Sequence, residues 1–475
     1  MDSDADSDMR TNPFLAASDL PYQLPPFASI RESDYGPAIE QGMAAQLAEI
    51  AALTGALEEP SYDNTVLALE RSGQALQRVL RVFYNQAAAD TTPGVQALQA
   101  EFGPRLAAHE DAIHLDAALF ARVRAVYERL RESGAGRGDE LGGNEGSEAG
   151  RGGDAVAGAR LVERYYTDFV RAGALLDAAA KDRLRELNGE LARLATEFER
   201  NLFEDTRARA VILESAADLE GLSDDAVSAA ASNAAAHGLA GKYLLSLQLP
   251  SNQQLLASLA RRPVRQRLYE ASVGRGSVLN RTLVVRIARL RAERAALLGY
   301  PSHAAYVVAE QTAGSVSAVE SLLRQLVEPA VANARREAGA LRAAFAADGF
   351  AAEEFAPWDW QFYAEKVRKA EFDVDASDLR PYFELERVLR DGVFFAAQRI
   401  YGLRFEERTD LVAYHSDARV FEVFEEDGTP LGLFVGDFYA RASKRGGAWM
   451  NELVPRSGLF GTKAVVVNNL NLAKP

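Results

Sequence analysis

The five histidines of the chain are the first residues to test for metal or acid–base chemistry, and they are His109, His114, His237, His303 and His415. The segment His109-Glu110 followed by His114 is close to the motif His-Glu-x-x-His, in which two histidines four residues apart bind one zinc ion and the glutamate activates bound water. Here the two histidines are five residues apart, which separates them by about 140° around a helix. They cannot both bind one ion, so we expect two ordinary surface or interface histidines.

The other residue types supply no complete catalytic set either. His303 follows a helix stop at Gly299 and is expected to open the next helix, while His237 stands just before Gly238 at an expected helix end. The sequence contains no Gly-x-Ser-x-Gly motif and no Gly-x-x-x-x-Gly-Lys-Ser/Thr motif. It also contains no cysteine, which excludes disulfides and thiolate metal sites and fits a reducing compartment.

Charge and hydropathy narrow the class of protein further. The 53 basic residues are outnumbered by 68 acidic residues, for a net charge of −15 and a pI near 5.0, which argues against general affinity for nucleic acid or anionic lipid. No stretch approaches the roughly 18 consecutive apolar residues of a membrane span. The first eight residues are acidic where a secretory signal would be basic and then apolar. We therefore expect a cytoplasmic protein.

Helical periodicity dominates the elements that must position any site. Leu184, Leu187, Leu191, Leu194 and Phe198 follow steps of three and four residues and form one continuous apolar stripe. Similar spacing predicts further helices over 281–298, 316–346, 360–369 and 384–401. The predicted fold class is therefore mainly α.

Strand-like segments are fewer and lie mostly near the C-terminal end. Residues 419–424 and 431–437 flank a turn and predict a β-hairpin, 464–468 predict a further strand, and 210–213 can pair with 241–250 as a ribbon. We divide the chain into an acidic disordered start (1–11), an extended arm with helices (12–207), a ribbon with central helices (208–413) and a β-rich region (414–475). A Gly-rich, charged run at 133–158 is predicted to be a flexible insertion within the second part.

The C-terminal region carries the most specific motifs, which are Tyr414 to Phe424, Gly432 to Arg441 and Ser443 to Met450. With them the sequence resembles the thimet oligopeptidase family of zinc metallopeptidases, closest to its bacterial peptidyl-dipeptidase (dipeptidyl carboxypeptidase) branch. Upstream segments resemble the family too: Asn12 to Leu15, Leu20 to Phe27, Leu290 to Tyr300, Pro357 to Tyr363 and Leu379 to Glu384. The resemblance covers nearly the whole chain, apart from the acidic start and the Gly-rich insertion.

This resemblance implies an elongated helical metallopeptidase scaffold with a deep channel, a small β-sheet, a zinc cofactor at the channel floor and hydrolysis of short peptides, with release of C-terminal dipeptides. In the family, the His-Glu-x-x-His helix and the third ligand, a glutamate, follow the region that corresponds to Asn469 to Pro475, where this chain stops. We therefore expect an incomplete catalytic domain whose zinc ligands and catalytic residues are absent, and a chain that is inactive by itself.

The same resemblance nominates residues for substrate contact. Peptides are often held as an added strand through main-chain hydrogen bonds to a sheet edge, and Val465, Val466, Val467 and Asn468 stand where such an edge strand would precede the zinc helix. His415 and Asp417 are expected to line the same floor, with Gly446 and Gly447 in a mobile loop over the cleft. The alternatives are a buried core strand for the first four and turn or packing roles for the other four.

Two other functions stay open at this stage. The chain could be a non-catalytic peptide-binding or helical interaction scaffold, or one half of a split enzyme completed by a polypeptide that supplies the missing zinc-binding region. Ending just after a strand would leave apolar surface uncovered, so we also expect aggregation or dependence on a partner.

Overall fold

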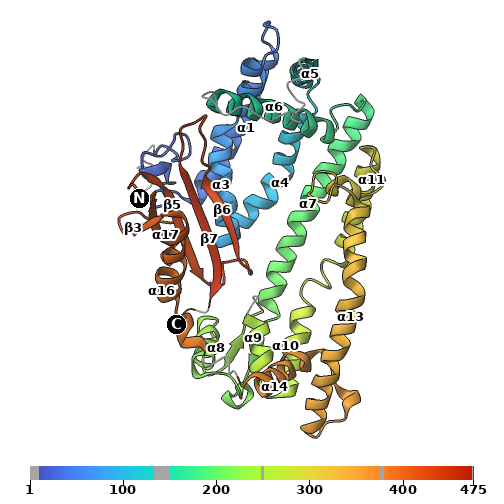
Figure 1. Cartoon of the computed structure of the whole chain (residues 1–475), viewed down its shortest axis with the longest axis vertical. Coiled ribbons are helices and arrows are strands. Elements are labelled where there is room, and N and C mark those ends of the chain that lie inside the picture. Colours follow the sequence, from blue (N-terminus) through green and yellow to red (C-terminus); the bar gives the residue numbers. More distant parts are fainter. Residues whose placement is uncertain (1–9, 133–148, 248–250, 374–378, 473, 475) are drawn as a thin grey trace, which may run out of the picture.

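The computed structural model describes residues 10–132, 149–247, 251–373, 379–472 and 474. It is an elongated, mainly helical molecule with a sheet built from the C-terminal region, as the sequence predicts (Figure 1). The long helices α7 and α13 run along its long axis, and the sheet lies beside α1 and α3 (Figure 1). Among the described residues, no helix combines the length and apolar composition needed to cross a membrane.

The N-terminal helices are α1 (Glu32–Thr54), α2 (Ala68–Arg71), α3 (Gln74–Ala89), α4 (Pro93–His114), α5 (Ala117–Glu132), α6 (Ala149–Arg171) and α7 (Ala178–Ala208). Local sequence explains where several of them begin. The Thr92 hydroxyl accepts a hydrogen bond from the Val95 amide at the start of α4, and the Asp177 carboxylate accepts one from the Ala180 amide at the start of α7. The leucine stripe predicted for α7 is buried, which confirms that helix.

The central helices are α8 (Asp224–Ala236), α9 (Ser251–Ser258), α10 (Arg262–Val273), α11 (Arg281–Leu297), α12 (His303–Val308), α13 (Val316–Ala347), α14 (Trp360–Phe372), α16 (Leu385–Arg387), the π-helix η7 (Val388–Phe394) and α17 (Phe395–Tyr401). The predicted ribbon is confirmed, because β1 (Val211–Leu213) pairs antiparallel with β2 (Tyr243–Leu245). The helical run from α16 to α17 stops at Gly402, whose φ of 74° is the left-handed conformation that favours glycine.

The larger sheet has five strands, β3 (Arg404–Glu407), β4 (Arg419–Phe424), β5 (Pro430–Tyr439), β6 (Trp449–Val454) and β7 (Ala464–Leu472). Their order is β3-β4-β5-β7-β6, with β5 and β7 parallel and every other neighbouring pair antiparallel. The predicted hairpin is β4 with β5. Sequence analysis did not predict β3 or β6, because neither segment has the dense β-branched pattern of β7.

One face of this sheet packs against helices from the opposite end of the chain. Leu433, Val435, Val465 and Val467 are buried in the same core as residues of α1, α3 and α4, including Ile39, Val79, Phe83 and Phe102. The segments predicted as 12–207 and 414–475 therefore share one core. The opposite face is covered in part by η7, through Leu389 against Phe421 and Phe438.

Two boundaries differ from the prediction. Residues 1–9 of the acidic start lie outside the described residues, but Arg10 already forms an ion pair with Asp34 at 2.6 Å. Most of the insertion predicted at 133–158 lies outside them too, whereas α6 begins at Ala149. A helix extends cooperatively from a well-packed segment, so α6 continues into a stretch whose own composition does not favour it.

Candidate functional site

Alternation along β7 divides the predicted substrate residues between two environments. Val465 and Val467 are fully buried in the core between the sheet and the N-terminal helices. Val466 and Asn468 point to the opposite face and are only half-buried. The core alternative is therefore confirmed for the first pair, while the second pair lies on the face that η7 covers only in part.

The expectation that Val465 to Asn468 form an exposed sheet edge is wrong. On one side of β7, Val465 is paired with Leu433 of β5, and on the other with Val454 of β6. Asn468 likewise lies between Gly436 and Met450. The strand at this edge of the sheet is β6, which returns antiparallel beside β7 although it precedes β7 in the chain. No local sequence pattern reveals such a return.

Gly446 and Gly447 lie in the exposed loop that leads into β6. Gly447 has a φ of +95°, a conformation that residues with a side chain rarely adopt. The side-chain amide of Asn471, near the end of β7, donates hydrogen bonds of 2.9 Å and 2.6 Å to the backbone carbonyls of Arg445 and Gly447. The loop is thus attached to β7 by a buried asparagine that sequence analysis missed. The mobility predicted for this loop stays a prediction.

His415 and Asp417 form the turn that precedes β4. The Asp417 amide donates a hydrogen bond of 3.0 Å to His415 Nδ1, and the Asp417 carboxylate lies 2.7 Å from the ammonium of Lys474, just beyond β7. Both residues therefore stabilise this turn, and a role in lining the channel floor stays a prediction. Their position at the C-terminal end of β7 places them at the same end of the sheet as Asn471.

A buried polar network centred on Asp437 of β5 was also missed by sequence analysis. Its carboxylate accepts hydrogen bonds from the Tyr414 hydroxyl at 2.6 Å and from the Arg441 guanidinium at 2.7 Å and 2.8 Å. The Lys444 ammonium lies 2.9 Å from the same carboxylate and donates to the Asp437 carbonyl at 2.8 Å. The side chains of Asp437 and Lys444 are both 0% exposed, so the pair is removed from water.

Burial and pairing have opposite effects on this carboxylate. Desolvation, the largest effect, would raise the Asp437 pKa, but hydrogen bonds from Arg441, Tyr414 and Lys444 outweigh it and hold the pKa below its ordinary value. Burial lowers the pKa of the Lys444 ammonium despite the neighbouring carboxylate. The network is therefore built around an ionised Asp437 and serves to hold the β5–β6 connection in one conformation.

The same connection is joined to the C-terminal end of α3. The Arg445 amide donates a hydrogen bond of 2.8 Å to the Ala88 carbonyl, and the Ser443 hydroxyl donates one of 2.7 Å to the Asp90 carboxylate. Arg441 also donates to the Ala89 carbonyl. Cationic groups at a helix C-terminus are stabilised by the helix dipole. These contacts fix the start of β6 relative to the N-terminal helices.

The histidines lie in separate surroundings within the described part of the chain. His109, which is buried, places Nε2 2.7 Å from Gln46 Oε1 of α1, whereas the ring of His114 packs against Phe169 with centroids 5.1 Å apart. In the part of the chain that the structure describes, no three histidine, cysteine, aspartate or glutamate side chains gather closely enough to hold a metal ion. The zinc implied by the resemblance therefore finds no fitting ligand set among these residues.

Comparison with known proteins identifies the scaffold. Peptidase family M3 matches residues 255–475. Dipeptidyl carboxypeptidase of Escherichia coli (strain K12) is 39% identical over 470 residues, which are 98% of this chain and 66% of the relative. The chain belongs to peptidase family M3. Dipeptidyl carboxypeptidase of Salmonella typhimurium (strain LT2) is 37% identical over 98% of this M3 chain, and oligopeptidase A of the same organism is 27% identical over 94%.

The M3 chain spans only part of these relatives, namely 66% of the length of each dipeptidyl carboxypeptidase. The region matched by the family begins near α9 and includes the whole five-stranded sheet. The matched region therefore contains the five-stranded sheet, the loop at Gly446 and Gly447, and the Asp437 network.

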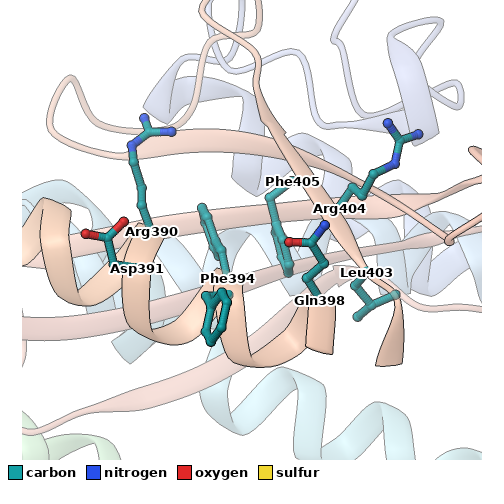
Figure 2. A pocket seen from close by; sticks show the side chains of 8 residues that line it. Arg390, Asp391, Phe394, Gln398, Leu403, Arg404 and Phe405 are labelled. Atoms are coloured by element: carbon teal, nitrogen blue, oxygen red, sulfur yellow. The ribbon is translucent and has the colours of Figure 1, made fainter. Parts of the chain in front are cut away.

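A shallow pocket of about 540 Å³ lies at the β3 end of the sheet, away from β6. Figure 2 shows the side chains that line it, which are Arg390, Asp391, Phe394, Phe395, Gln398, Leu403, Arg404 and Phe405. The rings of Phe394 and Phe405 stack at 4.1 Å. This arrangement provides apolar surface and two guanidinium groups but no nucleophile or paired acid and base, so we assign no chemistry to it.

Proposed function

We propose that this chain is the N-terminal and central part of a zinc metallopeptidase that releases dipeptides from the C-termini of short peptides. The observation that carries the proposal is the 39% identity to a dipeptidyl carboxypeptidase across 98% of the chain. Zinc ligands and the general base then come from polypeptide that the described residues do not include. A deep substrate channel, as the family resemblance implies, forms when that polypeptide is in place.

We further propose that the peptide is held at the β6 edge of the sheet. In the part of the chain that the structure describes, no strand pairs with the outer side of β6, which suits strand addition there, and the loop at Gly446 and Gly447 leads directly into that edge. On the face that η7 covers only in part, Met450 of β6 is 65% exposed. Asn468 Oδ1 is buried there without a hydrogen-bond partner among the described residues, which suits a site that another polypeptide completes.

Val466, Asn468, His415 and Asp417 remain proposed contacts on this face or at the end of β7. Val465 and Val467 are left out of this proposal because neither side chain nor main chain is free. These two valines anchor β7 in the core, and β7 in turn pairs with the edge strand β6.

The test measures dipeptide release from a short N-terminally blocked peptide by mass spectrometry, with zinc present. The chain alone is expected to be inactive. Mixing it with a polypeptide comprising the residues of the Escherichia coli relative outside the match is expected to restore release that a chelator abolishes. Strong, chelator-sensitive cleavage by the chain alone would refute the claim that it lacks the zinc-binding catalytic site. Products other than dipeptides would refute the assigned cleavage register.

A second candidate, a non-catalytic peptide-binding scaffold, is favoured by one observation, the lack of a metal-binding group among the described residues. Titration with the same peptide distinguishes the two. Micromolar binding by the chain alone, together with no activity after complementation, would support the scaffold.

A further inference from the structure

The middle of helix α13 has no packing partner in the described part of the chain. Every residue from Glu320 to Glu337 is exposed, whereas Ala338, Leu341 and Phe345 beyond it are buried. The buried end packs with α14, and α13 also contacts α12, the helix before it in the chain. Eighteen residues of helix therefore cross solvent without a close neighbour among the described residues (Figure 1).

This unpacked stretch is amphipathic. Its large apolar residues are Leu322 (58% exposed), Leu323 (54%), Leu326 (54%), Val327 (58%) and Val331 (41%). Steps of one, three, one and four residues place them on one half of the helix surface. The polar residues Ser321, Gln325, Glu328, Arg335 and Arg336 fall on the other half, and the ion pair of Arg324 with Glu320 at 2.8 Å lies at the border beside Val327 and Val331. A surface helix normally turns such an apolar half toward the core, and here it faces water.

The stretch is also a weak helix in isolation. Pro329 lies inside α13 and has no amide hydrogen to donate to the Gln325 carbonyl one turn earlier. In proteins, most of the stability of a helix comes from packing of its apolar face rather than from the helix itself. The exposed leucines and the internal proline together indicate that α13 forms its middle turns against another polypeptide.

We propose that the apolar half of α13, defined by Leu322, Leu323, Leu326, Val327 and Val331, is the docking face for a helical segment of the M3 polypeptide that this chain does not span. The proposal rests on the proposed function. The M3 relatives extend well beyond the match, since it covers 66% of each dipeptidyl carboxypeptidase, and that remainder must pack against the scaffold. An apolar stripe at helical spacing fits a second helix, with ridges of one in grooves of the other.

The experiment uses the full chain and, as the probe, the polypeptide comprising the Escherichia coli residues outside the match. Affinity is measured by analytical ultracentrifugation, and amide hydrogen exchange is followed over residues 320–337. We expect these amides to exchange quickly in the free chain and slowly in the complex. Leu326→Arg should weaken binding at least about tenfold, because it places a charge in the centre of the buried face.

Ser321→Arg is the matched control, since it adds the same charge about 140° around the helix from Leu326. It should leave the affinity unchanged within about twofold, because charges on an exposed rim contribute little. Both positions are exposed, so both variants should melt as the parent chain does. Equal affinity for the parent and L326R, or no slowing of exchange at 320–337, would overturn the proposal.

Two further outcomes separate this inference from the proposed function. A complex with slowed exchange at 320–337 but no dipeptide release supports the docking face and refutes the activity. Dipeptide release that L326R leaves intact supports the activity and refutes the docking face. A concentration-dependent dimer of the free chain that L326R dissolves would assign the face to a second copy and also overturn the proposal.

Discussion

Replacement of Asp437 by asparagine tests the role assigned to the buried network. The substitution keeps the shape of the side chain but removes the charge that balances Lys444, which is 0% exposed, and Arg441, which is 12% exposed. Breaking one partner of a buried pair costs about 3–5 kcal/mol, because the remaining charge stays desolvated. We expect a loss of this size in the local stability of β5, β6 and β7.

Amide hydrogen exchange measures this loss strand by strand, which avoids the assumption that a chain of 475 residues unfolds in one step. Asp410→Asn is the matched control, because Asp410 pairs with Arg408 at 2.7 Å but is 63% exposed. An exposed pair contributes about 0–1 kcal/mol.

A second substitution tests whether the loss of stability comes from the buried charge that Asp437→Asn leaves behind. Adding Lys444→Met to the Asp437→Asn variant should recover part of the lost stability, because it removes a buried cation that has lost its neighbouring carboxylate and leaves an apolar chain of similar length. A loss below about 1 kcal/mol for Asp437→Asn, or no recovery in the double variant, would show that the network does not depend on charge balance.

The same structure makes three further predictions. Because the folded-state pKa of Asp437 lies below its ordinary value of 3.8, its ionised form stabilises the fold above that pH. Protection of the sheet amides, after division by the intrinsic exchange rate at each pH, should therefore fall as the pH drops below it, an effect absent in Asp437→Asn. Gly447→Ala should cost about 1–2 kcal/mol, since Gly447 has a φ of +95°, whereas Gly446→Ala should cost much less; equal thermal melts would contradict this. Val467→Ala should lower the local stability of the sheet, measured by amide hydrogen exchange, by about 2 kcal/mol, whereas Val466→Ala, at a half-buried position, should lower it by less than about 1 kcal/mol.

Several features of this protein were determined by local sequence. The leucine stripe of α7, the ribbon of β1 with β2 and the hairpin of β4 with β5 follow from spacing and β-branched runs, and the structure confirms each of them. The separate roles of His109 and His114 also follow from spacing, because a helix turns through a set angle per residue. Membership of the family is likewise visible in the sequence, because the motifs that carry it are continuous segments of the chain.

Only the tertiary structure decided which strand lies at the edge of the sheet. β7 carries the strong strand pattern, but β6, with the weaker pattern, returns beside it and leaves β7 paired on both sides. The attachment of the Asp437 network to α3 was equally hidden, because it joins residues from opposite ends of the chain. The reason is physical: periodicity records which face of an element is buried, whereas pairing partners and buried ion pairs depend on contacts between segments far apart in the sequence.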